Sequence, residues 1–364
     1  MDEKDYMRRC LELARNGAGR VAPNPLVGCV IVHRGRVIGE GFHEVHGGPH
    51  AEVNAIASVA DPSLLRGSTL YVNLEPCSHW GKTPPCCDLI LRVGIPHVVV
   101  GMADPFERVA GEGIFRMREA GIKVSVGILE DECLSLNRKF VTFHTHKRPY
   151  IVLKWAETRD GYLDNNRMSD TPPTWLTGPS CRLMVHRLRA ESGGILVGTN
   201  TLLRDNPALT VRDCPGKSPL RVVVDRTLKL PSSLRVFDRE APTLILTDYA
   251  LAEQAREKFA GIEVVGIDAS GDVIGQMLAQ LHQRGVQSLL VEGGGEVLHG
   301  FIGRGLWDEM QVFVSPLGVD ELSGGRNEVP RGVHAPEPAG RIVEQFSVGG
   351  VRITMSFNDA GDHA

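Results

Sequence analysis

The stretch Leu74–Asp88 reads LEPCSHWGKTPPCCD and contains three cysteines, two of them adjacent. Zinc at a hydrolytic site takes three protein ligands, commonly thiolates and imidazoles, and keeps a fourth position for water. The earlier stretch PHAEVNA, residues 49–55, supplies His50 and, two residues later, Glu52. One histidine, two cysteines and a nearby glutamate that is not a ligand form the zinc-deaminase arrangement. The spacing predicts a catalytic zinc site with His50, Cys77 and one of the two adjacent cysteines as ligands.

Helical phase distinguishes the two adjacent cysteines. Leu89, Ile90 and Val93 are expected to form the inner face of a short helix that begins at the cysteine pair. Cys86 precedes these residues by three, four and seven positions and therefore shares their face. Cys87 is rotated by about 100° from it. We expect Cys86 to bind the metal and Cys87 to be a small helix residue.

Glu52 is predicted to be the catalytic carboxylate. Residues two apart do not face each other on a regular helix, so His50 and Glu52 suit the start of a helix, where Pro49 is favoured. The metal would lower the pKa of its bound water and give hydroxide near neutral pH, while Glu52 carries the proton to the ring nitrogen and the departing ammonia. A closed structural zinc would need a fourth ligand, which His79 could supply, and would leave Glu52 without a role.

Composition limits the class of protein. The 364 residues carry a net charge of −4, with 42% apolar and 23% charged residues, which predicts a globular chain of two domains. Eight scattered cysteines do not form a disulfide-dense pattern. The N-terminus lacks an apolar signal core, and no apolar run is long enough to span a bilayer. We therefore expect a reduced, cytoplasmic protein without membrane or nucleic-acid partners.

Strand and helix patterns alternate along the chain in two series. The first series runs from a helical pattern at 6–17 through a hairpin around Arg34 to an apolar strand at 123–129. A basic, polar stretch ends near His146, and a second alternation follows it. These patterns predict two α/β domains, residues 1–146 and 147–364. The segment 322–341 is rich in Gly and Pro and is expected to be a surface loop.

The first half resembles a known family. HAE at 50–52, followed by EPCSHWGKTPPC at 75–86, is similar to the pyrimidine deaminase domain of the bifunctional riboflavin-biosynthesis deaminase/reductases. APNPLVGCVIV at 22–32 and GEGFHEVHGGPHAE at 39–52 match the same domain. The resemblance implies a three-layer α/β/α, cytidine-deaminase-like domain. It also implies substrate contacts from Asn24, His43, His79 and Lys82.

These implied contacts have ordinary alternatives, and the family pattern is not complete. Asn24 between two prolines could be a turn residue, and His43 a polar residue at a strand end. Lys82 and the histidines suit the phosphate or ring carbonyl of a phosphoribosylated diaminopyrimidinone. The family has DPNP after its fourth strand, whereas this chain has ADPFERVAGEG at 103–113.

The second half resembles the reductase half of the same family, a dihydrofolate-reductase-like α/β fold that uses NADPH. The similarity rests on KWAETRDGYL at 154–163, GGILVGTNTLLRDNPALTVR at 193–212, VVVDRT at 222–227 and VEGGG at 291–295. Glycines after a strand let backbone amides approach a phosphate, although the same glycines also suit a tight turn. The resemblance implies cofactor contacts from Ala156, Trp175, Thr201, Asp205, Gly294, Gly295 and Glu296.

The resemblance further implies contacts to the ribosyl phosphate from Arg189, Leu209, Arg212 and Glu292. Guanidinium pairs with phosphate in a bidentate way, although these arginines could also be solvated surface charges. Lys154 is a candidate to protonate the sugar oxygen while the opened ribose is reduced, or could be an ordinary strand-end lysine. The chain departs from the family at Thr158, at Asn206 and in the loop 164–174, where two prolines remove backbone donors.

The resemblance covers residues 1 to about 357 and implies a two-step enzyme of riboflavin biosynthesis. One zinc ion would serve the deamination of 2,5-diamino-6-(5-phosphoribosylamino)pyrimidin-4(3H)-one. NADPH would then reduce the ribosyl group of 5-amino-6-(5-phosphoribosylamino)uracil to ribityl. We also expect a homo-oligomer. One alternative is a deaminase whose second domain is only a scaffold. Another is a nucleic-acid base deaminase, which should carry a basic stripe and exposed aromatic residues, whereas only 5% of this chain is aromatic.

Overall fold

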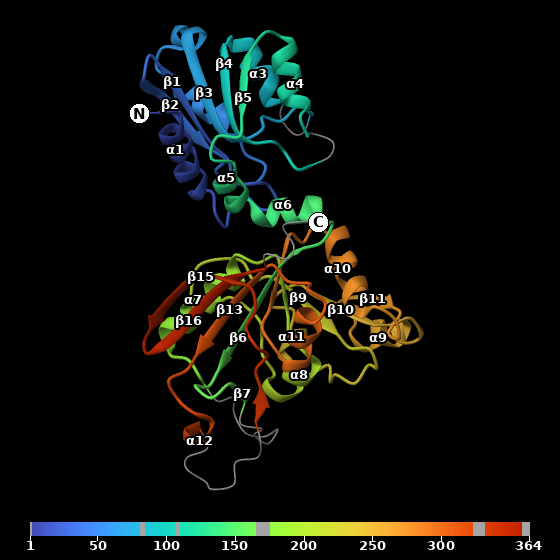
Figure 1. The fold of residues 1–364 in the computed structure, drawn as a ribbon. Coiled ribbons are helices and arrows are strands. Elements are labelled where there is room, and N and C mark those ends of the chain that lie inside the picture. The colour runs from blue at the N-terminus through green and yellow to red at the C-terminus, as the bar shows by residue number, and fades with distance from the viewer. Residues whose placement is uncertain (1, 81–83, 107–109, 165–174, 323–331, 359–364) are drawn as a thin grey trace. The chain divides into compact units, whose positions relative to one another are not determined.

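The computed structural model describes residues 2–80, 84–106, 110–164, 175–322 and 332–358. The chain divides into two compact units, Met1–Lys147 and Arg148–Ala364, each with its own central sheet (Figure 1). Within the described residues, no helix combines the length and the apolar character needed to cross a membrane. Both units mix helices with strands, so the predicted α/β class is confirmed.

The first unit is built on a five-stranded sheet in the order β2-β1-β3-β4-β5. β1 pairs antiparallel with both β2 and β3, and β3, β4 and β5 run parallel. Its elements are α1 (Glu3–Arg15), β1 (Gly28–His33), β2 (Arg36–Phe42), α2 (Ala51–Ala57), η1 (Pro62–Gly67), β3 (Ser68–Leu74), α3 (Cys86–Val93), β4 (His97–Met102), α4 (Glu112–Glu119), β5 (Lys123–Val126), α5 (Glu130–Leu136) and α6 (Arg138–Thr145).

Helices cover both faces of this sheet. One apolar cluster joins α1 and α5 to residues of β1, β3 and β4. A second cluster joins α2, α3 and Met117 of α4 to the opposite face. The sheet is therefore the middle of three layers, as predicted. Because β3 and β4 are buried on both faces, their middle residues, 70–72 and 98–100, are apolar without alternation.

The second unit is built on a nine-stranded sheet in the order β11-β10-β9-β8-β12-β6-β13-β16-β15. The strands from β11 to β13 run parallel, and β16 and β15 extend the sheet in antiparallel pairs. Its elements are β6 (Tyr150–Glu157), β7 (Tyr162–Asp164), α7 (Pro179–Ala190), β8 (Gly194–Leu196), α8 (Thr199–Asp205), β9 (Leu220–Val224), η2 (Arg235–Phe237), β10 (Thr243–Asp248), η3 (Tyr249–Leu251), α9 (Ala252–Lys258), β11 (Glu263–Ile267), α10 (Val273–Gln283), β12 (Ser288–Val291), α11 (Gly295–Ile302), β13 (Glu309–Val314), α12 (Val319–Leu322), β14 (Val333–His334), β15 (Arg341–Val348) and β16 (Val351–Phe357).

Two apolar clusters cover the two faces of the parallel strands. α10 and α11 pack on one face, and α8 and α9 pack on the other. Of the expected surface loop at 322–341, residues 323–331 lie outside the described residues. The prediction is wrong for Val333–His334, which forms β14 and pairs with β7. A pair of two residues is too short to produce a periodic pattern in the sequence.

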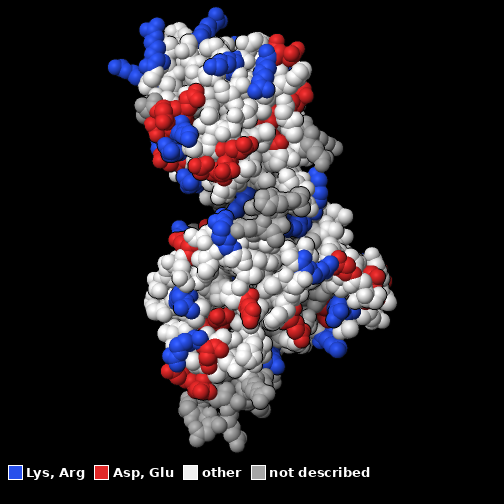
Figure 2. All heavy atoms as spheres, in the orientation of Figure 1, with Lys and Arg blue, Asp and Glu red and all other residues white. Residues whose placement is uncertain are grey.

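Acidic and basic side chains are mixed over the described surface of each unit. Figure 2 shows Lys and Arg interspersed with Asp and Glu, and no continuous basic stripe follows either unit on the face in view. Binding of a nucleic-acid backbone along its length would require such a stripe. The charge distribution on this face therefore does not favour the nucleic-acid alternative.

Candidate functional site

Three elements of the first unit bring the predicted zinc ligands together. His50 is the N-cap residue of α2, Cys77 follows β3, and Cys86 is the first residue of α3. The Nδ1 atom of His50 lies 3.5 Å from Sγ of Cys77 and 3.3 Å from Sγ of Cys86. Ligand atoms of a tetrahedral zinc site with ordinary bond lengths are separated by about 3.6 Å from nitrogen to sulfur. The donor set and its spacing therefore fit zinc.

The structure places Cys86, and not Cys87, beside His50, but for a different reason from the one that the sequence suggested. Cys87 and Ile90 belong to the apolar cluster beneath the sheet, so Cys87 lies on the core face of α3. Cys86 turns away from that face toward His50. The structure groups Cys86 with His50 and Cys77, as predicted, but the helical-phase argument is wrong, because Cys87, and not Cys86, packs with Ile90 in the apolar cluster.

Glu52 lies in the first turn of α2 and is only 3% exposed. Burial, reinforced by repulsion from Cys77, raises the pKa of Glu52 to about 7. Hydrogen bonding with Cys86 lowers the pKa of Cys77, which favours the thiolate form that binds metals. A carboxyl group that exchanges its proton near neutral pH, next to these metal-binding side chains, suits general acid–base chemistry.

Asn24 and His43 contact each other. The amide Nδ2 of Asn24 lies 2.9 Å from Nε2 of His43, and Nδ1 of His43 lies 2.9 Å from the carbonyl oxygen of Pro49. If Nδ1 donates its proton to Pro49, Nε2 accepts from Asn24, which is the neutral form of the ring. Burial lowers the pKa of His43, in agreement with that form. The His43 ring meets the His50 ring edge to face at 5.5 Å, so this pair lies beside the ligands.

The other implied deaminase contacts lie in the loop after Cys77. His79 is exposed, and Lys82 falls outside the described residues. Asp104, from the segment that departs from the family pattern, is attracted to His79. Burial raises the pKa of Asp104 to about 6, although the hydrogen bond from the Phe106 amide opposes this shift.

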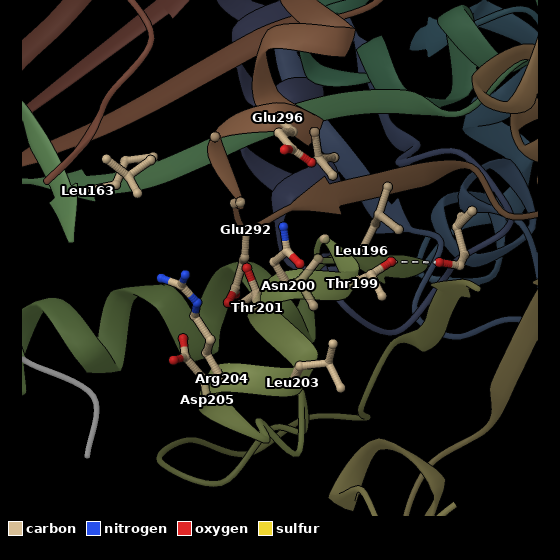
Figure 3. A pocket seen from close by; sticks show the side chains of 18 of the residues that line it. Leu163, Leu196, Thr199, Asn200, Thr201, Leu203, Arg204, Asp205, Glu292 and Glu296 are labelled. Carbon is tan, nitrogen blue, oxygen red and sulfur yellow. Dashed lines mark hydrogen bonds between the residues drawn. The ribbon is translucent and has the colours of Figure 1, made fainter. Parts of the chain in front are cut away.

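A second site lies in the second unit, where a cavity of about 1000 Å³ opens at the carboxyl ends of β6, β8, β9 and β12. Figure 3 shows Thr201, Arg204 and Asp205 projecting from α8, and Glu292 and Glu296 on the opposite wall of the cavity. Of the implied cofactor contacts, six line this cavity: Ala156, Thr201, Asp205, Gly294, Gly295 and Glu296. Ligands of open parallel sheets bind at this end of the strands.

The glycine turn after β12 forms one wall of the cavity. Gly293 and Gly294 have φ values of 114° and 80°, which side chains rarely adopt. A Cβ atom on Gly294 would lie 3.2 Å from Oγ1 of Thr201 and 3.4 Å from Cα of Gly198, so the turn also approaches α8 closely. α11 begins directly after the turn, and its first residues, Gly295, Glu296 and Val297, line the cavity.

Glu292 and Arg189, both predicted to bind substrate, bind each other. Two bonds of 2.7 and 2.6 Å join the guanidinium to the carboxylate, and the two side chains are 12% and 9% exposed. Burial alone would raise the pKa of Glu292, but attraction to Arg189 outweighs it and the pKa is lowered. Burial lowers the pKa of Lys154, and Glu292 opposes that shift. The three residues form one charged group beside the cavity.

Five predicted residues of the second unit are not among those that line the cavity: Trp175, Leu209, Arg212, Arg189 and Lys154. Trp175 is 65% exposed and lies against Arg182, with the guanidinium carbon 5.6 Å from the ring centroid. Leu209 is buried, and the backbone amide of Arg212 donates to Nδ1 of His186. The segment 164–174, which precedes Trp175 in the sequence, lies, apart from Asp164, outside the described residues.

Comparison with known proteins agrees with both sites. The cytidine and deoxycytidylate deaminase zinc-binding region matches residues 1–102, and the RibD C-terminal domain matches residues 149–327. The riboflavin biosynthesis protein RibD of Aquifex aeolicus is 42% identical over 318 residues, which cover 86% of this chain and 87% of that protein.

Two solved structures share the whole architecture. The Thermotoga maritima diaminohydroxyphosphoribosylaminopyrimidine deaminase/5-amino-6-(5-phosphoribosylamino)uracil reductase is 36% identical, with a TM-score of 0.82 over 98% of each chain. RibD of Acinetobacter baumannii is 30% identical, with a TM-score of 0.83 over 97% of this chain and 98% of that one. The dihydrofolate-reductase-like class of the second unit is thereby confirmed. The chain belongs to the RibD family, the bifunctional deaminase/reductases of riboflavin biosynthesis.

Proposed function

We propose that residues 1–146 deaminate 2,5-diamino-6-(5-phosphoribosylamino)pyrimidin-4(3H)-one. The observation that carries this proposal is the group of His50, Cys77 and Cys86 with the buried carboxyl of Glu52 beside it. Zinc held by these three ligands would supply a Lewis acid that lowers the pKa of a water molecule. Glu52 would take one proton of that water and give it to the ring nitrogen as the hydroxide adds to the ring carbon. It would then carry a second proton, from the added hydroxyl group, to the amine that leaves as ammonia.

The remaining deaminase contacts orient the substrate. Neutral His43, fixed by Pro49, directs the Asn24 amide beside the ligands, where it can bind a ring substituent. His79 and Lys82 belong to the loop between the two cysteine ligands and are proposed to face the ribosyl phosphate. A cationic loop at this position would favour the phosphorylated substrate over a free pyrimidine.

We propose that residues 147–364 reduce 5-amino-6-(5-phosphoribosylamino)uracil with NADPH. The cavity of about 1000 Å³ between the glycine turn and α8 supports this assignment, because the first residues of α11 line it and a helix N-terminus binds phosphate groups. NADPH would supply the hydride for C1 of the opened ribose. Arg189, Leu209, Arg212 and Glu292 are proposed to hold the substrate, and Lys154 to give a proton to the sugar oxygen.

A preference for NADPH over NADH is supported by the residues after β9. The Asp225 carboxylate is 2% exposed and accepts the backbone amides of Lys229 and Leu230, so it turns back into its own loop. Enzymes that use NAD commonly direct a carboxylate at the ribose 2′-hydroxyl, whereas a cation accommodates the 2′-phosphate. Arg226 and Lys229, both exposed, line the cavity immediately after that aspartate.

Replacing Arg226 by Ala should therefore weaken NADPH binding by about tenfold and leave NADH binding nearly unchanged, because a charge-assisted bond to the 2′-phosphate is lost. Dissociation constants for both dinucleotides, measured by quenching of protein fluorescence, test this expectation. Arg187→Ala is the matched control, since Arg187 is an exposed arginine of the same unit outside this cavity. Equal losses for NADPH and NADH would contradict the assignment.

The two activities can be tested in one preparation. Ammonia release from the diaminopyrimidinone measures the first step, and NADPH oxidation with supplied deaminated product measures the second. Wild-type protein should perform both. A chain that binds zinc, is folded and releases ammonia but never oxidises NADPH would support the alternative in which the second unit is a scaffold.

We also propose that the chain forms a homo-oligomer through the edge of its larger sheet. β15 pairs only with β16 among the described strands, and Ile342 and Val343 on it are 61% and 38% exposed. An exposed edge strand with apolar side chains is a site for pairing with another chain.

Ile342→Lys should shift the protein toward the monomer, because a charge on the edge strand opposes pairing. Sedimentation velocity over a range of protein concentrations measures the change. Lys123→Ala, on a strand of the first unit, serves as the control. An unchanged oligomer distribution for Ile342→Lys would place the interface elsewhere.

A further inference from the structure

We propose that Arg116 of α4 is a positioning residue that joins the two cysteine-bearing segments of the zinc site. Its Nη1 donates to the carbonyl oxygen of Ser78, the residue after Cys77, at 2.8 Å. Its Nη2 donates to Oδ1 of Asp88, two residues after Cys86, at 2.6 Å. One guanidinium thus bridges the loop that carries the first cysteine and the helix that carries the second.

The helix that carries Arg116 is itself anchored on the other side of Cys77. The Glu75 carboxylate is 3% exposed and accepts four backbone amides at 2.9 to 3.2 Å. These amides belong to Asp104 and Gly111, which precede α4, and to Gly113 and Ile114, which lie in its first turn. Cys77 is therefore flanked by two attachments to the same segment, one through Glu75 and one through Ser78.

Close packing reinforces this attachment. A Cβ atom on Gly113 would lie 2.3 Å from the carbonyl oxygen of Pro76, so the start of α4 presses against the residue before Cys77. A side chain there would push α4 away from the cysteine loop. The backbone of Arg116 is consequently held in place relative to Cys77. Its guanidinium then connects this part of the structure to Asp88 of α3.

Cys77 and Cys86 lie on different segments, so the spacing of their Sγ atoms depends on how those two segments are held relative to each other. Partners outside the ligand shell commonly change metal affinity by about 10- to 100-fold. The planar guanidinium offers two parallel donors with a fixed separation, which suits a bridge between two acceptors. Arg116 acts through Ser78 and Asp88 and does not touch the ligand atoms in the contacts described, so its effect should lie at the lower end of that range.

This inference rests on the proposed zinc site, and the experiment separates the two. Zinc release from the holoenzyme to an excess of a chromophoric chelator is timed for wild type, Arg116→Met, Asp88→Asn and Arg118→Met. We expect about tenfold faster release for Arg116→Met, a smaller acceleration for Asp88→Asn, and little change for Arg118→Met. Arg118 is the matched control, because it lies on the same helix and donates to the carbonyl of Val124 instead.

A double-mutant cycle gives the second readout. The Arg116→Met, Asp88→Asn double variant should release zinc no faster than Arg116→Met alone, because both changes break the same bridge. The role of Arg116 would be overturned if Arg116→Met released zinc within twofold of the wild-type rate, or if Arg118→Met accelerated release equally. Additive effects of Arg116→Met and Asp88→Asn would overturn it as well. If Arg116→Met does not fold, Asp88→Asn still tests the bridge, and wild type without bound zinc would instead refute the site itself.

Discussion

Glu52→Gln is expected to lower the deaminase turnover by at least about 10³-fold and to leave the reduction of supplied deaminated substrate at the wild-type rate. The amide has the shape of the carboxyl group but neither accepts nor returns a proton at neutral pH. Glu52 is 3% exposed, and the substitution leaves no unpaired charge in its place. The change should therefore remove proton transfer without disturbing α2 or the three ligands.

Ammonia release measures the lost activity, and zinc content measured by elemental analysis shows that the ligands still hold the metal. Glu119→Gln, an exposed glutamate at the end of α4, is the control and should keep both activities. Deamination within tenfold of wild type would show that another group carries the proton. Loss of both activities in Glu52→Gln would contradict two separate sites.

The sequence was sufficient to predict the zinc ligands because their chemistry is narrow. A combination of thiolates, an imidazole and a nearby glutamate is typical of a catalytic zinc site and of few other sites. His50, Cys77 and Glu52 could therefore be predicted as site residues before their positions in space were known. The choice of Cys86 over Cys87 needed the direction of the first turn of α3. Helical phase could not supply that direction, because Cys86 and Cys87 are both buried, one beside His50 and the other in the core.

Contacts between segments far apart in sequence were harder to predict. Arg189 and Glu292 were each expected to face the substrate, but no pattern in either segment shows that they pair across 103 residues. The pairing of Glu75 with the segment before α4, and of Arg116 with Ser78 and Asp88, has no sequence signal either. Such bonds depend on how the loops at one edge of a sheet meet, which spacing along the chain does not determine.

Lys154→Met is expected to lower the turnover of the reductase by about 10²- to 10³-fold, in the range typical of a lost general acid, and to leave deamination unchanged. Lys154 lies on β6 with Nζ 4.9 Å from the centroid of the Phe313 ring. A methionine can occupy the same apolar path without the ammonium group. Glu292 keeps its two bonds from Arg189, so the substitution does not leave that carboxylate unpaired.

Separate measurements of NADPH binding and turnover distinguish proton donation by Lys154 from a general disturbance of the cavity. Because Lys154 is not among the residues that line the cavity, its replacement should change the dissociation constant of NADPH by less than about twofold while NADPH oxidation falls. Lys217→Met, an exposed lysine of the same unit, should behave as wild type. Undiminished oxidation by Lys154→Met would assign the proton to another group, and weakened NADPH binding would make Lys154 part of the cofactor site. If Lys154 acts only on the ribose, its replacement should abolish reduction while NADPH binding and deamination both stay intact.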